Sequence, residues 1–178
     1  MGLVMDPVLV RKARPDDAPE LVRLRHAMFQ AMAAAGAASR PQDTDDTSWY
    51  PAAEKAIVSR ITQDTLAAFV IDDKAAGVAR NDEGAVLLAC SVVSLENRLP
   101  GPGFPRGMSG SMSTVFVAPA HRGRGLARAV VSAGLDWLSE MGAEVVDLHA
   151  TPDAERLYRS LGFSEAPSLA LRRINHQL

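Results

Sequence analysis

The feature that most constrains this chain is a short glycine-arginine segment, residues 122–127 (Arg-Gly-Arg-Gly-Leu-Ala), which lies between two different periodicities. Before it, residues 111–117 alternate as in a β-strand. After it, apolar residues recur at helical spacing from Gly125 to Met141. A strand that turns directly into a helix is a unit of mixed α/β architecture, so the segment argues against an all-β fold.

The rest of the chain predicts the same kind of architecture. We expect further strands at 7–13, 65–72, 85–95, 145–149 and 168–174, and helices at 17–36, 49–63 and 151–161. Asp17 and Glu20 predict a capping box at the first helix. Residues 98–110 hold three prolines and four glycines and predict an irregular loop. This order fits an α/β (mixed α+β) fold, with a central mixed sheet of about six or seven strands and helices on both faces.

Composition limits the size and setting of this fold. The chain has 178 residues, 47% of them hydrophobic, which is enough for the core of a single domain over residues 1–178. The net charge of -2 supplies no overall field for nucleic acid or an anionic membrane. No apolar run approaches the roughly 20 residues that span a bilayer, and no signal peptide is evident. Cys90 is the single cysteine, so a thiolate metal cluster is excluded, and we expect a reducing, cytoplasmic location with no metal.

The position of the glycine-arginine segment at a helix start predicts an anion site. The first N–H groups of a helix are unpaired and lie at the positive end of its dipole, an arrangement suited to a diphosphate. Gly123 and Gly125 permit positive φ, while Arg122 and Arg124 add charge. A tight turn with solvated arginines is the alternative. A Rossmann loop would need glycine at Arg128, and the ending of a Walker loop is absent.

The surroundings of the segment carry a family resemblance. Residues 117–119 read Val-Ala-Pro before it, and residues 158–163 read Tyr-Arg-Ser-Leu-Gly-Phe after it. With the signature Gln/Arg-x-x-Gly-x-Gly/Ala met within 122–127, the chain resembles the GNAT superfamily of acetyl-CoA-dependent N-acetyltransferases. The resemblance follows the element order of the whole chain, but it is strong only over about 113–163.

This resemblance implies acetyl-CoA as the cofactor and a set of residues that bind it. The strand through 115–117 is expected to splay from the next strand, so that its main-chain groups can pair with the pantetheine arm. Many relatives carry Asn where this chain has Thr151, so a hydroxyl would have to make that contact. The expected cofactor-binding residues are Val115, Phe116, Val117, Arg122, Gly123, Arg124, Gly125, Leu126, Ala127 and Thr151.

The resemblance also assigns catalytic roles. Tyr158 stands where relatives place the tyrosine that protonates or hydrogen-bonds the coenzyme A sulfur; its alternative is simple aromatic packing. Glu96 and His149 are the candidates for the base that accepts the amine proton, although either could be an ordinary surface residue. A backbone N–H on the splayed strand, such as that of Val117, is expected to meet the oxyanion. Cys90 lies in an apolar strand and is a weak candidate for an acyl-enzyme.

The acceptor is the least determined part of this interpretation. Asp46, Trp49 and Tyr50 combine a carboxylate with aromatic rings and would suit a cationic amine, whereas Arg98 and Arg106 would favour an acceptor bearing a carboxylate. We expect a small-molecule or peptide amine that attacks the thioester directly in a ternary complex.

Two other function classes compete with this hypothesis. One is a catalytically inactive coenzyme A-binding sensor or interaction module of the same fold. The other takes the arginine-glycine loop and residues 172–173 as RNA contacts, which the overall acidity disfavours. The oligomeric state is open, with a homodimer among the alternatives.

Overall fold

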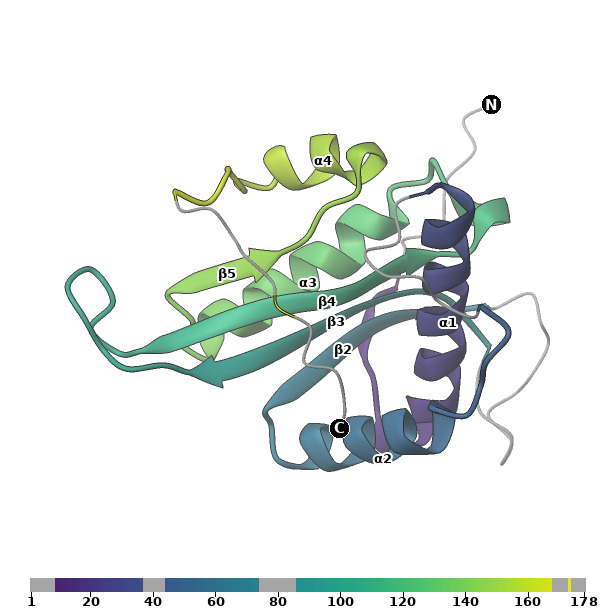
Figure 1. Cartoon of the computed structure of the whole chain (residues 1–178), viewed down its shortest axis with the longest axis horizontal. Helices are drawn as coiled ribbons and strands as arrows, with labels where there is room; N and C mark the ends of the chain where they lie inside the picture. Colours follow the sequence, from purple (N-terminus) through teal and green to yellow (C-terminus); the bar gives the residue numbers. More distant parts are fainter. Residues whose placement is uncertain (1–8, 37–43, 74–85, 168–172, 174–178) are drawn as a thin grey trace.

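The computed structural model describes residues 9–36, 44–73, 86–167 and 173. Five strands of these ranges form one sheet in the order β1-β2-β3-β4-β5 (Figure 1). They are β1 (Arg11–Lys12), β2 (Leu66–Asp72), β3 (Leu87–Asn97), β4 (Met108–Val117) and β5 (Val145–Leu148). The first three neighbouring pairs are antiparallel and β4 pairs with β5 in parallel, so the sheet is mixed as predicted. The expected six or seven strands are not matched, and the strand expected at 168–174 lies almost wholly outside the described residues.

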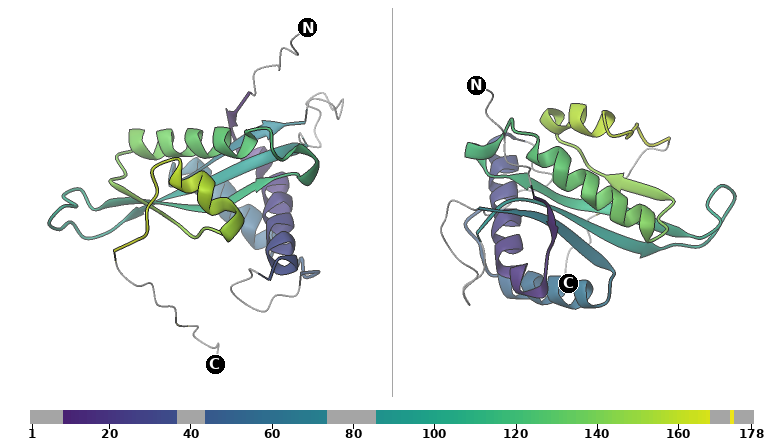
Figure 2. Two further views of the ribbon diagram at one scale, coloured as in Figure 1. Left: turned by 90° about the horizontal axis from the view of Figure 1, so that it is seen from above. Right: turned by 180° about the vertical axis from the view of Figure 1, so that it is seen from behind.

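Helices cover both faces of this sheet, as the sequence predicts (Figures 1 and 2). The helical elements are η1 (Pro15–Asp17), α1 (Ala18–Ala34), α2 (Tyr50–Thr62), η3 (Pro119–His121), α3 (Leu126–Glu140) and α4 (Pro152–Arg159). On one face α1 and α2 pack over a cluster that includes Leu21, Leu24, Ile57, Val70 and Phe116. On the other, α3 and α4 pack over Val93, Met112, Val131, Trp137 and Leu138. The predicted buried stripe of α3 is therefore correct, except that Met141 is 40% exposed.

The start of α1 differs from the expected capping box. Asp17 makes no side-chain cap to α1, and its carboxylate accepts hydrogen bonds from both Nη atoms of Arg11, which also donates to Asp72. Glu20 accepts from the backbone N–H of Leu87 at 2.9 Å. Burial acts to raise the pKa of Asp17, but the hydrogen bonds from Arg11 and from the backbone N–H of Arg14, together with the charges of both arginines, outweigh it and hold that pKa below its ordinary value. Both carboxylates thus fasten α1 to the sheet instead of capping it.

Strand β4 begins three residues earlier than the sequence predicts. Gly110 lies within it, because the backbone there pairs with Leu95 of β3 on one side and Val146 of β5 on the other. A Cβ at Gly110 would stand 2.8 Å from Leu138 Cδ1, so the glycine lets α3 approach the sheet closely. The glycine that indicates a loop in the sequence is therefore a packing position within a strand.

The middle of β4 contains a β-bulge. Val92 of β3 lies opposite Thr114 and Val93 lies opposite Met112, so Ser113 is an extra residue without a partner on β3. Pairing between β4 and β5 ends at Met112 and Leu148, immediately before this residue. Because a bulge bends its strand and increases the local twist, it accounts for the point at which β5 leaves β4.

Other sequence expectations concern the edge and the surface of the molecule. Val145 in β5 is 46% exposed, so β5, the last strand of the described sheet, is not the buried strand that its composition suggests.

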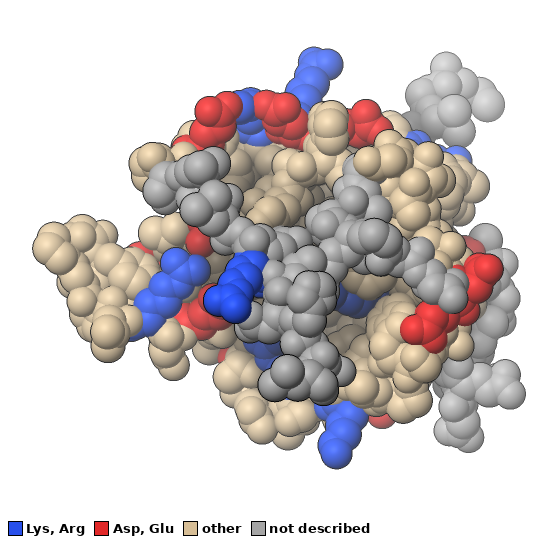
Figure 3. All heavy atoms as spheres, in the orientation of Figure 1, with Lys and Arg blue, Asp and Glu red and all other residues tan. Residues whose placement is uncertain are grey.

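Acidic and basic side chains both occur on the face seen in Figure 3, so no field of one sign covers it. Within the described ranges, no helix has the length and apolar character needed to cross a membrane, and no cluster of side chains suits a metal ion.

Candidate functional site

A cavity of about 1600 Å³ lies where β5 leaves β4 and is bounded by α1, the loop before α3, and the segment from β5 to α4. It gathers most of the site residues that the sequence predicts: Glu96, Val115, Phe116, Val117, Arg122, Gly123, Gly125, Leu126, Ala127, His149, Thr151 and Tyr158. Four predicted residues are not part of its lining, namely Arg124, Asp46, Trp49 and Tyr50. The cofactor and catalytic predictions therefore converge in space, whereas the acceptor prediction does not.

The N-terminus of α3 forms one wall of the cavity. Gly123 and Gly125 have φ values of 74° and 77°, in the left-handed region that favours glycine, and Gly125 is the N-cap without any side-chain cap. The backbone N–H groups from Gly123 to Arg128 make no hydrogen bond within the ranges that the structure describes. A row of free donors thus stands at the positive end of the helix dipole, which is the geometry of an anion site.

The arginines around this wall have different surroundings. Arg122 Nε donates to the carbonyl of Val117 at 3.2 Å, and its guanidinium lies 5.8 Å from the centre of the Phe116 ring. It therefore lies along β4. Arg128, considered in the sequence only as a departure from a Rossmann loop, lines the cavity and donates to Ser160 Oγ, which ties α3 to α4.

The outer edge of β4 forms a second wall. The N–H of Ala118 donates to the carbonyl of Leu88 in β3 at 2.8 Å. Because main-chain polar groups alternate between the two sides of an antiparallel strand, those of Phe116 face β3, and those of Val115 and Val117 face away from it. The contact from Arg122 to the Val117 carbonyl agrees with this alternation. Val115 and Val117 thus present main-chain groups on the side that β5 has left, and Phe116 contributes only its side chain to the cavity.

Tyr158 on α4 combines a packed ring with an accessible hydroxyl. The residue is 7% exposed, and its ring meets Phe163 edge-on at 5.7 Å in the core beneath α3. Its hydroxyl has no hydrogen bond in the described part of the chain, yet it is not a buried unpaired atom, so it opens to the cavity. Burial raises the pKa of Tyr158, so the hydroxyl keeps its proton at neutral pH and is available as a donor.

The two candidate bases come from different strands, Glu96 from the end of β3 and His149 from the residue after β5. Glu96 Oε1 accepts a hydrogen bond from Ser111 Oγ at 3.2 Å, and Oε2 lies 3.7 Å from Arg98, which also pairs with Asp147. His149 follows β5, is exposed, and makes no hydrogen bond within the described ranges. Both side chains line the cavity, so both stay candidates.

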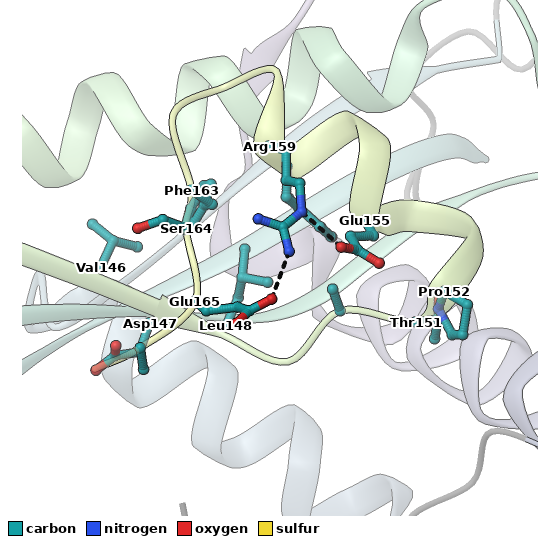
Figure 4. Close-up of a pocket in the computed structure, with 13 residues that line it drawn as sticks. Val146, Asp147, Leu148, Thr151, Pro152, Glu155, Arg159, Phe163, Ser164 and Glu165 are labelled. Carbon is teal, nitrogen blue, oxygen red and sulfur yellow. Dashed lines mark hydrogen bonds and ion pairs between the residues drawn. The ribbon is translucent and has the colours of Figure 1, made fainter. Parts of the chain in front are cut away.

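A second, smaller cavity of about 380 Å³ lies between β5, α4 and the segment that follows α4 (Figure 4). Arg159 crosses it through ion pairs with Glu155 at 2.6 Å and Glu165 at 3.0 Å. Thr151 and Tyr158 line both cavities, so α4 forms the wall between them.

The residues expected to bind the acceptor serve the packing of α2 in the structure. The hydroxyl of Tyr50 hydrogen-bonds His26 Nδ1 at 2.5 Å, and the rings of Trp49 and Tyr50 meet edge-on at 4.9 Å. Trp49 Nε1 donates to the carbonyl of Asp46. These contacts hold the start of α2 against α1, and their role toward an acceptor stays a prediction.

Helix α1 supplies the wall that faces the β4 edge, through Arg25, Met28, Phe29 and Met32. Arg25 Nη1 donates to Thr114 Oγ1 at 2.5 Å, and its guanidinium lies 4.8 Å from the centre of the Phe29 ring. The sequence interpretation missed Arg25, because an arginine between apolar residues of a helix is usually solvated. Its partner Thr114 lies 89 residues away, so no local pattern connects them.

Comparison with known proteins bears directly on this geometry. The sequence model of the Acetyltransferase (GNAT) family matches residues 39–163. The chain belongs to the GNAT acetyltransferase family. The resemblance read from residues 113–163 is thereby confirmed at the level of the family. The family also supports acetyl-CoA as the cosubstrate.

Individual relatives agree with this assignment. A mycothiol acetyltransferase of Clavibacter sepedonicus is 31% identical over 85% of this chain and 53% of its own length. The chain thus spans about half the length of this relative. Among solved structures, a GCN5-related N-acetyltransferase from Ralstonia eutropha has a TM-score of 0.72 and 22% identity over 93% of this chain and 97% of its own. A predicted acetyltransferase with acetyl-CoA from Clostridium acetobutylicum has a TM-score of 0.74 and 14% identity over 93% and 95%. At these identities the two structures show the shared fold.

Proposed function

We propose that this protein transfers the acetyl group of acetyl-CoA to a primary amine of a small-molecule or short-peptide acceptor, by direct attack in a ternary complex. The observation that carries the proposal is that one cavity gathers the free N–H groups of α3, the open edge of β4 and the Tyr158 hydroxyl. Acyl transfer needs these three functions together: an anion site for the coenzyme, donors for the carbonyl, and a proton for the thiolate. The name of the curated relative, mycothiol acetyltransferase, supports acetyl as the acyl group.

The residues of the cavity fit coenzyme A on two counts. The unpaired N–H groups from Gly123 to Arg128 suit its pyrophosphate, with Arg122 beside them. The main-chain groups of Val115 suit the amides of its pantetheine arm, because they lie on the side of β4 without a strand partner, and the N–H of Val117 on the same side stays available for the thioester. Both contacts use the backbone, which explains why the binding surface contains many apolar side chains.

Acetyl-CoA would supply a thioester carbonyl, and the chain's own residues would do the rest. The attacking amine must be neutral, and Glu96 or His149 would accept its proton directly or through water. The N–H of Val117 would stabilise negative charge on the carbonyl oxygen. As the carbon–sulfur bond breaks, Tyr158 would donate its hydroxyl proton to the departing thiolate, a role suited to a hydroxyl that stays protonated at neutral pH.

The test is release of free coenzyme A thiol from acetyl-CoA across a panel of primary amines, with acetyl-CoA binding measured separately by calorimetry. We expect amine-dependent thiol release together with formation of the N-acetyl product. Tight acetyl-CoA binding without turnover of any amine would instead support the inactive coenzyme A-binding module. Absence of acetyl-CoA binding would refute both readings.

A further inference from the structure

Arg25 is a largely buried cation with no carboxylate partner in the described part of the chain. Its single hydrogen bond goes to the neutral hydroxyl of Thr114, and its face lies over the Phe29 ring. Burial lowers the pKa of Arg25. The other arginine of α1, Arg23, shows the usual arrangement, since both its Nε and its Nη2 donate to the carboxylate of Glu20.

The free donors of Arg25 open into the main cavity. A guanidinium carries five N–H donors, of which Thr114 receives one. No buried side-chain nitrogen or oxygen lacks a partner among the described residues, so the remaining donors are not sealed in the core. Arg25 lines the cavity beside Met28 and Phe29 on α1, across from the open edge of β4.

The other arginines that line the cavity have either acidic partners or a place at the proposed coenzyme site. Arg98 lies between Glu96 at 3.7 Å and Asp147 at 3.4 Å. Arg122 and Arg128 also hydrogen-bond neutral acceptors, the Val117 carbonyl and Ser160 Oγ, but they lie beside the start of α3, where the pyrophosphate is proposed to bind. Arg106, which the sequence offered together with Arg98 as an acceptor contact, does not line the cavity. Arg25 is thus the cation on the α1 wall that has no negatively charged partner among the described residues.

We propose that Arg25 binds a carboxylate of the acceptor, so that the preferred substrates are primary amines that also carry a carboxylate group. An unpaired charge among apolar side chains is costly, and a ligand carboxylate would offset that cost by accepting two parallel N–H bonds from the planar guanidinium. This inference rests on the proposed acetyl transfer and names the substrate class of the same cavity.

The register of β4 sets the distance that such an acceptor must span. Ser111 Oγ holds Glu96, and Thr114 Oγ1 holds Arg25. Three residues of strand separate these two positions by at most about 10 Å. An acceptor whose amine approaches Glu96 while its carboxylate meets Arg25 would therefore have the length of a dipeptide or a long ω-amino acid.

The experiment compares matched acceptors that differ only in charge: 6-aminohexanoate with 6-aminohexanamide, and glycylglycine with its C-terminal amide. We expect the acids to exceed the amides roughly 10- to 100-fold in kcat/KM, as for a hydrogen-bonded charged pair. In Arg25→Met this preference should fall to near unity, and in Arg25→Lys it should fall in part, because an ammonium lacks the planar fork. Arg23→Met, on the same helix but outside the cavity, should retain it.

Three kinetic results would overturn the proposal. They are equal use of acid and amide by the wild type, an undiminished preference in Arg25→Met, and faster acetylation of 5-aminopentylphosphonate than of 6-aminohexanoate, which would assign the site to phosphate-like groups. The thermal midpoint of Arg25→Met should not fall, since the variant removes an unpaired buried charge; a large fall would assign Arg25 a purely structural role. Binding of the product 6-acetamidohexanoate to the coenzyme A complex separates the two proposals. If no amine is acetylated, binding to the wild type but not to Arg25→Met would keep the carboxylate site and refute the catalytic proposal.

Discussion

Gly125, the N-cap of α3, offers the sharpest test of the anion site. Its φ of 77° lies in the left-handed region, and no atom stands within 4 Å of the place a Cβ would occupy. A side chain there costs backbone strain of about 1–2 kcal/mol but meets no steric clash. Asn and Asp tolerate this conformation best among residues with a side chain. Gly125→Asn and Gly125→Asp should therefore lose similar amounts of folding free energy.

The two variants differ by one negative charge, which acts with opposite signs in the free and bound protein. In the free protein, a carboxylate at the start of α3 interacts favourably with the helix dipole by about 0.3–1 kcal/mol, so Gly125→Asp should be at least as stable as Gly125→Asn. With coenzyme A bound, a carboxylate about 5 Å from a phosphate charge is repelled by roughly 1–3 kcal/mol, depending on solvent screening. The affinity of Gly125→Asp for coenzyme A should then be roughly 5- to 150-fold lower than that of Gly125→Asn.

Calorimetric titration with coenzyme A and thermal unfolding of the free proteins measure these two effects separately. Gly103→Asp is the matched control, because Gly103 has a φ of 75° and equally open surroundings but lies in the loop before β4. It should bind coenzyme A as the wild type does. Equal affinities of the Asn and Asp variants would refute the assignment of the pyrophosphate to the start of α3.

The remaining predictions concern Tyr158 as the proposed acid, the thiol of Cys90 and the carboxylate of Asp17. Tyr158→Phe should lower kcat by about 100-fold or more while the Kd of acetyl-CoA changes little, and equal losses in both would remove the acid role. Burial raises the pKa of Cys90 to about 12, so Cys90→Ala should keep its turnover, and a thiol reagent should label the wild type only after unfolding; an acetylated Cys90 trapped during turnover would contradict direct attack. Folding lowers the pKa of Asp17, so its carboxylate stabilises the folded protein fully at pH values above its pKa in the unfolded chain. This stabilisation is lost as pH falls through the pKa of Asp17 in the folded protein. In urea titrations between pH 6 and pH 3, the free energy of unfolding should thus fall less for Asp17→Asn than for the wild type. Equal falls in the two proteins would refute the lowered pKa of Asp17.

The features that the sequence predicts best are those coded by neighbouring residues. The helix at 126–140 has an apolar stripe, and the glycines before and after it fix its ends, so its bounds agree to within about one residue with those expected. The glycine-arginine loop is equally local, and its free N–H groups follow from its place between a strand and a helix. These local signals located the wall of the cavity that is proposed to bind the cofactor.

The features that the sequence could not predict depend on partners far along the chain. Asp17 and Glu20 have the spacing of a capping box, but Arg11 and the Leu87 N–H compete for their carboxylates in the folded protein. Gly110 reads as part of a loop until β3, β5 and Leu138 enclose it. Arg25, the residue proposed to bind the acceptor, was missed for the same reason, because its partner Thr114 is 89 residues away.

The bulge at Ser113 connects the two halves of the cavity. Met112 packs on the α3 side of the sheet, and simple alternation would place Thr114 on that side as well. The extra residue reverses the alternation, so Thr114 turns toward α1 and meets Arg25, while Phe116 joins the core beneath α1. The same residue marks the end of pairing with β5 and leaves the main chain of Val115 and Val117 open. The extra residue Ser113 thus creates the open edge of β4 that is proposed to bind the coenzyme. It also directs the Thr114 hydroxyl toward Arg25, the arginine proposed to bind the acceptor. Both proposed binding sites therefore depend on a single distortion of β4.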